Sequence, residues 1–250
     1  MKVSIILHVL CVTAVIASYD VTMDLDAGLT GTCTCTCVSN KPKDCVEAQR
    51  YSNQSGVVMI YPNGDNTPLR VYCDHDTDGG GWLVFQRRQD GSVDFYRDFA
   101  EYQNGFGDVE GEFWLGLDTL HALTTLKNQV MRVDMTQWNG TNIFATYSDF
   151  SVSDSCNQFK LKYDNMTDGN VARDSLSLAN GVTFSTKDEG KVSCATSYHG
   201  GWWYGMNCGD SNLNGLYKDS KQWGWDGIFW YSVDRFYSLK GSEMKIRPAS

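Results

Sequence analysis

The chain has 250 residues, and its 30 Asp and Glu side chains against 21 Lys and Arg give a formal net charge of −9 at pH 7. Such an acidic chain is a poor partner for nucleic acid, because phosphate binding depends on clustered Lys and Arg. The length suffices for one large domain with a substantial core, or for two small ones.

The N-terminus predicts a secretory signal at residues 1–18. Lys2 precedes a nearly unbroken apolar run, and the small residues Ala17 and Ser18 follow it, as signal peptidase requires. A membrane anchor needs about 20 apolar residues, and this run is shorter. We therefore expect a secreted, extracellular protein with no segment inserted in a membrane.

Residues 19–42 predict an irregular linker, because Ser, Thr, Gly and Asn are frequent there and no heptad or collagen repeat is present. Within it, Cys33, Cys35 and Cys37 alternate with threonine, so an extended chain would point all three sulfurs to one face. We expect them to form interchain disulfides in a homo-oligomer. Pairing with Cys156 and a metal site are the alternatives. Metal is the weaker one, since no histidine is nearby and secreted thiols oxidise.

Residues 43–250 predict one α+β domain with an antiparallel sheet. Apolar and polar residues alternate in three stretches, as in half-buried strands: Met131–Met135, Phe159–Tyr163 and Met244–Ile246.

A short helix is predicted where Leu117, Leu120 and Leu123 recur every three residues, with a cap near Asp118. From about Ser177 onward the periodicity fades and Gly, Asn, Asp, Trp and Tyr become dense. Loop-rich regions of this kind commonly carry binding sites.

No catalytic residue is predicted. The triplet Gly79-Gly80-Gly81 lacks a following Lys-Ser/Thr and predicts a turn with positive φ rather than a phosphate loop. Neither a Gly-X-Ser-X-Gly elbow nor a His-Glu-X-X-His pair occurs. The histidines beyond the signal, at positions 75, 121 and 199, have no nucleophile or ligand at useful spacing.

Four stretches follow one another in an order that is highly specific. They read CDHDTDGGGWLVFQRRQDGSVDFYRDFAEYQNGFGDVEGEFWLG from Cys73, CATSYHGGWWYGMNC from Cys194, SNLNGLY from Ser211 and YSLKGSEMKIRP from Tyr237. From about Lys43 onward the chain resembles a secreted fibrinogen-related domain of the ficolin and tachylectin kind. The resemblance implies a small N-terminal part, a central antiparallel sheet and a loop-rich C-terminal part with the ligand site.

Two disulfides are implied by this resemblance. The pairs are Cys45 with Cys73, around the N-terminal hairpin, and Cys194 with Cys208, beside the ligand pocket. The partner of Cys156 is left open.

An acetyl-binding pocket is implied as well. Tyr198 matches a tyrosine that lines the pocket, and the bond Asn207-Cys208 matches a cis peptide beside it. Gly209 departs from the family, where many acetyl binders have histidine. A tyrosine is also missing from the far wall, where Trp223 or Trp225 would replace it. In that region we expect Trp202, Trp203 and Trp230 to belong to the core.

Calcium is a possible cofactor by the same resemblance. Asp188 matches an acid of the family's calcium loop and Glu189 is a substitute for a second one, but FSTKDEGKVSCA is several residues shorter than the family's loop. Calcium takes six to eight oxygen ligands, and this loop offers few.

Three Asn-X-Ser/Thr triplets, at Asn53, Asn139 and Asn165, are acceptors for N-glycosylation in a secreted chain and predict surface turns. Together the features predict a secreted lectin that binds acetylated or related sugars in innate defence. The alternative is a fibrinogen-related module that binds a protein receptor or clotting component, as in angiopoietins, tenascins or venom relatives.

Overall fold

The computed structural model describes residues 2–10, 16–24, 41–64 and 66–249. The chain divides into two compact units, Met1–Pro42 and Lys43–Ser250. In the first unit, β1 (Lys2–Leu10) pairs antiparallel with β2 (Ile16–Asp24). Cleavage after Ser18 would remove β1 and the start of β2, so this pairing belongs to the uncleaved chain. The cysteines at 33, 35 and 37 lie outside the described residues.

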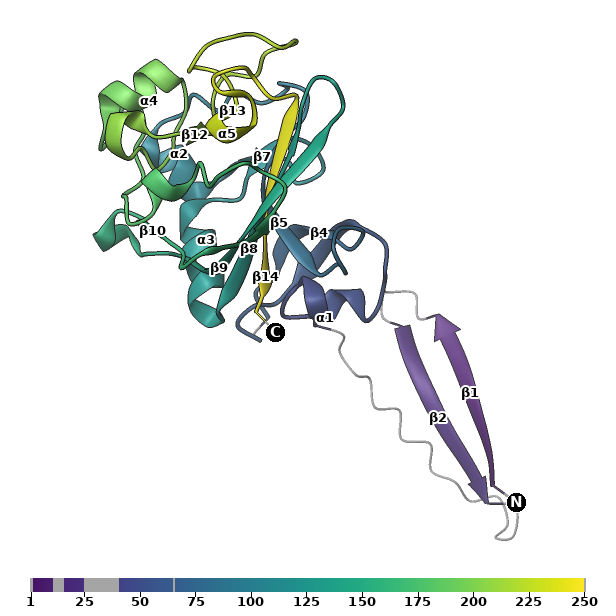
Figure 1. The fold of residues 1–250 in the computed structure, drawn as a ribbon. Helices are drawn as coiled ribbons and strands as arrows, with labels where there is room; N and C mark the ends of the chain where they lie inside the picture. The colour runs from purple at the N-terminus through teal and green to yellow at the C-terminus, as the bar shows by residue number, and fades with distance from the viewer. Residues whose placement is uncertain (1, 11–15, 25–40, 65, 250) are drawn as a thin grey trace. The chain divides into compact units, whose positions relative to one another are not determined.

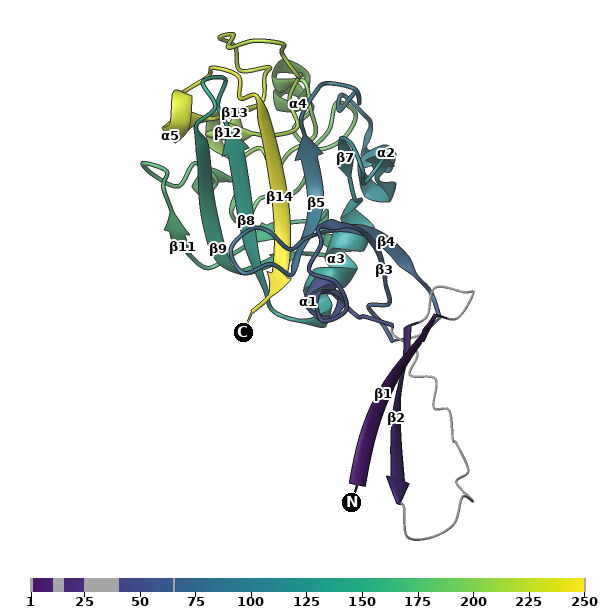
Figure 2. The same cartoon turned by 90° about the vertical axis from the view of Figure 1, so that its right-hand side faces the viewer.

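The second unit is built on an antiparallel sheet of ten strands in the order β10-β9-β8-β14-β5-β4-β3, with β11 paired to β9 and β7 paired to β5 and β6. The strands are β3 (Gly56–Ile60), β4 (Leu69–Asp74), β5 (Trp82–Arg88), β6 (Phe106–Gly107), β7 (Phe113–Trp114), β8 (Gln129–Thr136), β9 (Asn142–Val152), β10 (Leu161–Lys162), β11 (Met166–Gly169) and β14 (Gly241–Pro248). Figure 2 shows β14, the last strand of the chain, between β8 and β5. The C-terminus therefore completes the middle of the sheet.

Helices are short in this unit. They are α1 (Cys45–Gln49), α2 (Phe99–Asn104), α3 (Leu117–Leu126), α4 (Val192–Tyr198) and α5 (Tyr231–Asp234), with 3-10 turns η1 (Ser155–Asn157), η2 (Ser177–Ala179) and η3 (Met206–Cys208) and a small ladder of β12 (Ser211–Asn212) with β13 (Phe229–Trp230). Within the described residues, no helix is long and apolar enough to cross a bilayer. The α+β fold is confirmed.

The alternating stripes in β8 and β14 are confirmed. In β8, Met131, Val133 and Met135 are buried, and in β14 Met244 and Ile246 face the same core. The predicted strand Phe159–Tyr163 forms only the two residues of β10. Gln158 and Phe159 have φ values of 53° and 49°, a left-handed backbone that ends a strand.

The predicted helix is present as α3, and its N-cap residue is Gly116, two positions before Asp118. The helix begins at Leu117 after Gly116, whose φ of 104° allows the turn, and no side chain caps it. Asp118 lies in the first turn, where its carboxylate accepts a hydrogen bond from Gln103. The helix and its start were therefore predicted, but Asp118 does not cap it, because glycine occupies the cap position.

The predicted glycine turn has φ values of 79°, 79° and 73° at Gly79, Gly80 and Gly81. A Cβ on Gly80 would lie 2.8 Å from the backbone oxygen of His75, so the close approach excludes a side chain there.

Aromatic rings fill the core between the sheet and the C-terminal loops. Trp114, Trp203 and Phe184 contact one another, with ring centroids 5.0 to 6.1 Å apart. Trp202 and Trp230 are also buried. The prediction that Trp202, Trp203 and Trp230 belong to the core is confirmed, which separates them from the exposed rings described next.

Candidate functional site

The loop-rich C-terminal part holds the predicted ligand residues around α4 and η3, which Figure 1 shows in green. The disulfide between Cys194 in α4 and Cys208 in η3 closes this loop, with the two Cα atoms 5.4 Å apart. Lys191 donates a hydrogen bond of 2.8 Å to the backbone oxygen of Gly205 across the same loop. The second implied disulfide, Cys45–Cys73, joins α1 to β4. Both pairs named by the resemblance are therefore formed.

Tyr198 lies mostly inside the fold. Its side chain is part of the core, with 8% of the residue exposed, and its ring lies 5.7 Å from Tyr204 and 5.6 Å from Phe229. Burial raises the pKa of the hydroxyl, and the nearby Asp210 carboxylate adds to that shift. No group among the described residues hydrogen-bonds this hydroxyl. The ring of Tyr198 is therefore covered by the fold, and the group it has left for a ligand is its hydroxyl.

The peptide bond Asn207–Cys208 is trans, and the described residues contain no cis peptide bond. The expectation of a cis bond is wrong, because the loop turns by another means. Asn207, Cys208 and Gly209 have φ values of 51°, 65° and 85°, so three successive residues adopt positive φ. The turn exposes the Asn207 side chain to solvent.

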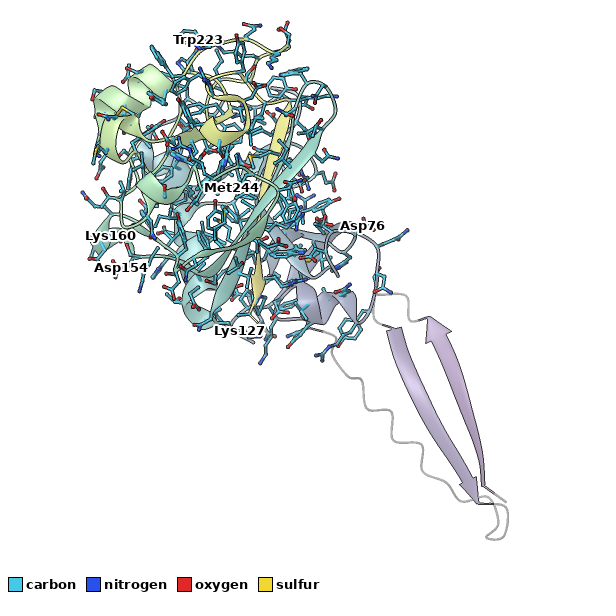
Figure 3. All side chains as sticks on the ribbon, in the orientation of Figure 1. Asp76, Lys127, Asp154, Lys160, Trp223 and Met244 are labelled. Atoms are coloured by element: carbon cyan, nitrogen blue, oxygen red, sulfur yellow. A yellow bond between two sulfur atoms is a disulfide. The ribbon has the colours of Figure 1, made fainter. Side chains whose placement is uncertain are left out.

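Two predicted ring residues, Trp223 and Trp225, are exposed to 56% and 47%. Their rings meet edge to face at 5.1 Å, and a β-bridge places Tyr237 beside Trp223. Phe236 supports Trp225 from below at 5.6 Å. We call Trp223, Trp225, Phe236 and Tyr237 the aromatic ledge. Figure 3 shows Trp223 at the top of the domain, at the end away from Lys127.

A chain of ring contacts joins this ledge to Tyr198. Phe236 lies 5.2 Å from Phe229, and Phe229 lies 5.6 Å from Tyr198. The structure thus brings Trp223 and Trp225 together, and Tyr198 is two rings away from Trp225. The predicted residues belong to one aromatic cluster, but they do not line one pocket.

A hollow of about 600 Å³ adjoins the ledge. It is lined by Ala172, Arg173, Ser232, Val233, Asp234, Arg235, Tyr231 and Tyr237, so Tyr237 belongs to both features. Arg173 bonds to Asp210 at 2.9 Å, next to the disulfide loop, and its guanidinium lies 5.0 Å over the ring of Tyr231. Aromatic faces and guanidinium donors are the groups that hold a sugar ring and its oxygens.

The sequence reasoning did not identify the residues that line the hollow. It noted only that aromatic residues, including Tyr231, are dense in this region. Arg173 and Asp210 are 37 residues apart, and no motif connects them. The only sequence signal for the hollow is weak: Arg235 is a single basic residue in a stretch rich in aromatic residues.

The Asp188 carboxylate is engaged in hydrogen bonds within the protein. Asp188 Oδ1 accepts hydrogen bonds from the Phe99 backbone at 3.0 Å and from the Thr186 hydroxyl at 2.7 Å. The Glu189 backbone oxygen accepts from the Thr186 N–H at 2.9 Å, which closes a tight turn. Among the described residues, no group of three or more His, Cys, Asp or Glu side chains could hold a metal ion. Calcium binding by this loop stays a prediction.

Each histidine of the second unit has a structural partner. Burial lowers the pKa of His75, against the opposing effect of Asp74 and Asp76, and its Nδ1 accepts the Gly81 N–H at 3.3 Å. His121 Nδ1 lies 2.8 Å from the Val152 oxygen, and the ring of His199 stacks on another ring at 4.0 Å. These contacts orient the rings for packing.

The three glycosylation acceptors, Asn53, Asn139 and Asn165, are all exposed, as the predicted surface turns require. Cys156 is exposed and has no disulfide partner among the described residues. Glycosylation and the pairing of Cys156 stay predictions.

Comparison with known proteins gives one family. The model for the C-terminal globular domain of fibrinogen beta and gamma chains matches residues 41–249. Ryncolin-4 of Cerberus rynchops is 43% identical over 219 residues, covering 85% of this chain and 63% of the relative. Tenascin-R of Homo sapiens is 46% identical over 216 residues, covering 83% of this chain and 15% of the relative. The chain thus spans less than two thirds of either relative.

Solved structures agree on the fold. The fibrinogen-like globe domain of human ANGPTL2 has a TM-score of 0.79 and 37% identity, covering 84% of this chain and 100% of that domain. The lamprey fibrin D-dimer complexed with the peptide Gly-His-Arg-Pro-amide has a TM-score of 0.74 and 32% identity, covering 84% of this chain and 74% of that one.

Proposed function

Because the chain belongs to the fibrinogen C-terminal domain family, we propose that it is a secreted recognition protein that binds acetylated or related sugars on foreign surfaces. Domains of this family bind ligands and are not enzymes, and both lectin-like and protein-associated members are similar to this chain. The apolar N-terminus and the two disulfides support secretion, since disulfides persist in oxidising compartments.

The observation that carries the proposal is the aromatic ledge next to the hollow. A soluble domain seldom exposes large rings side by side without using them. The edge-to-face pair Trp223–Trp225 is held by Phe236, so its rings are already placed before a ligand arrives. The faces of such rings pack against the C–H face of a sugar or against an acetyl methyl group.

One site of this kind is shallow and would bind weakly. We propose that the cysteines at 33, 35 and 37 link subunits, which raises avidity through effective concentration. Electrophoresis with and without reductant measures this. A single monomer band under both conditions would remove the oligomer from the proposal.

A glycan array tests the sugar proposal, with each acetylated sugar printed beside its non-acetylated counterpart. We expect Trp223→Ala and Trp225→Ala each to weaken binding about tenfold, which corresponds to about 1.4 kcal/mol for a lost ring. Tyr51→Ala is the matched control, because Tyr51 is exposed to 52% and is not part of the ledge. The sugar proposal fails if the intact protein is retained by no glycan, with or without calcium.

The second candidate is a protein-binding module, and the burial of Tyr198 favours it. The expected acetyl pocket would need that ring open to a ligand, whereas the exposed rings form a ledge that suits a flat protein surface. The lamprey fibrin relative was solved with a bound peptide. Tyr198→Phe removes only the hydroxyl and spares the core. Binding to a protein partner that survives this change and an excess of N-acetyl sugar would establish the second candidate.

A further inference from the structure

Charges in the hollow beside the ledge do not cancel. Lys221 neutralises Asp234 at 2.6 Å, and Arg173 neutralises Asp210 at 2.9 Å. Arg235 remains, and its exposed side chain forms no hydrogen bond, ion pair or ring contact with any described residue. In a chain with a net charge of −9, this hollow carries one cation in excess.

The backbone of Arg235 is unusual. Its φ of 53° and ψ of −119° fall where residues with a Cβ are strained and glycine is favoured. Its N–H bonds the Tyr231 oxygen at 2.9 Å, and the next ring, Phe236, is locked among three others, which together hold the turn. The side chain contributes no contact to the fold that would explain an arginine there.

Two tyrosines share the hollow with this arginine. Tyr231 and Tyr237 line the same hollow, and Tyr237 continues into the ledge beside Trp223. Tyr237 therefore connects the ledge to the hollow that Arg235 lines. The guanidinium presents a planar fork of donors, which matches the paired oxygens of a carboxylate or a sulfate ester.

We infer that the hollow binds the anionic group of an acidic saccharide, a carboxylate or sulfate ester, with Arg235 as the specificity-determining residue. This rests on the proposed function, since the sugar ring is held by the ledge. Arg173 supports the site less directly, because Asp210 already occupies one side of its guanidinium.

The experiment measures affinity by surface plasmon resonance for matched pairs: an acetylated carboxylate sugar against its methyl ester, and a sulfated N-acetyl sugar against the unsulfated one. We expect the charged member of at least one pair to bind five-fold or more tightly, and this preference to shrink from 50 to 300 mM salt because the contact is electrostatic. Which pair shows the preference distinguishes carboxylate from sulfate. Arg235→Gln is expected to abolish the preference while the uncharged sugar binds as before.

Two further variants keep the result interpretable. Arg50→Gln removes an exposed arginine outside the site and leaves the preference unchanged. Arg235→Gly also abolishes the preference, but its unfolding temperature does not fall, because glycine accepts the strained backbone. Equal binding of charged and uncharged sugars, or an unchanged preference in Arg235→Gln, overturns the inference while the sugar proposal stands.

If no sugar binds at all, the proposed function fails, and inorganic sulfate still decides whether the hollow attracts anions. Its effect on the unfolding temperature is compared between the intact protein and Arg235→Gln at equal ionic strength. A larger rise for the intact protein supports the anion site. Equal rises overturn it.

Discussion

Lys245 is buried in the sheet and forms ion pairs with three carboxylates. Replacing it by methionine should destabilise the domain. The residue is 2% exposed in β14, and its Nζ lies 2.7 Å from Asp74, 2.9 Å from Asp134 and 2.8 Å from Glu243. These carboxylates come from β4, β8 and β14. Lys245→Met keeps the apolar stem but takes the cation away from Asp74, whereas Asp134 keeps Arg132 at 2.8 Å and Glu243 keeps Arg87 at 2.6 Å.

The magnitude follows from this geometry. Removing one partner of a buried ion pair costs about 3–5 kcal/mol, and because Asp134 and Glu243 keep partial contact with water we expect about 3 kcal/mol at pH 7. Burial alone would raise the pKa of Asp74, but hydrogen bonds from Lys245 and Thr77 with the Lys245 charge outweigh it and hold the pKa at about 2. Against the usual 3.8, this contributes about 2 kcal/mol of stability.

The sign of the pH dependence differs between the two proteins. In the intact protein, the Asp74 contribution is present above pH 4 and is lost as the pH falls toward 2, because the folded state has the lower pKa. In Lys245→Met, the hydrogen bond and charge of Lys245 no longer offset burial, so burial raises the pKa of Asp74 relative to the intact protein and acidification lowers the cost of the change. The difference between the two proteins should therefore be smaller at pH 4 than at pH 7.

Urea unfolding at pH 7 and pH 4 measures this difference. Lys240→Met is the matched control, since Lys240 is exposed and its side chain has no partner among the described residues, and we expect less than about 0.5 kcal/mol from it. A loss below about 1 kcal/mol in Lys245→Met, or one that does not shrink at pH 4, would refute the reasoning.

Three other outcomes are expected. Chelation by EDTA should leave the unfolding temperature within about 1 °C, because Asp188 Oδ1 already accepts two hydrogen bonds from the protein, and a drop of several degrees would indicate a bound calcium ion. Replacing both Cys194 and Cys208 by alanine should lower the free energy of unfolding in urea by about 3 kcal/mol, since the disulfide closes a separation of 14 residues. Cys156→Ser is the control, because Cys156 is exposed and has no disulfide among the described residues. Equal stability of the double variant and the control would contradict this prediction. Gly205→Ala should cost about 2–3 kcal/mol, because its methyl would overlap the backbone oxygen of Leu178, whereas Gly56→Ala meets no atom within 4 Å and should be nearly neutral; a neutral Gly205→Ala would show that the loop relaxes.

The sheet could be predicted because its signal is local. Met131, Val133 and Met135 repeat with the period of a strand, and each is buried in β8. The expectation that Trp202, Trp203 and Trp230 belong to the core is likewise confirmed, since all three are buried. Patterns that span a few residues survive in the fold because neighbouring side chains alone decide them.

Loop conformation could not be predicted in the same way. The expected cis bond at Asn207 is replaced by successive positive φ values, and the predicted strand at Phe159 is shortened by the same kind of backbone. Such backbone conformations depend on the distance between the two fixed ends of the loop and on the packing around it, which no short sequence pattern shows. The pair Arg173–Asp210 joins segments 37 residues apart, so it exists only once two loops have packed.

The candidate site lies on loops, and packing between side chains holds it in place where no helix or strand does. Phe236 contacts Trp225 on the exposed side and Phe229 on the buried side, and backbone hydrogen bonds such as Gly224 N–H to the Phe236 oxygen add to this attachment of the ledge to the core. Binding rings fixed in this way lose little freedom when a ligand arrives, which favours affinity on a small surface. Substitutions of the exposed residues around this ring, such as Arg235, are therefore expected to change the ligand without changing the core beneath them.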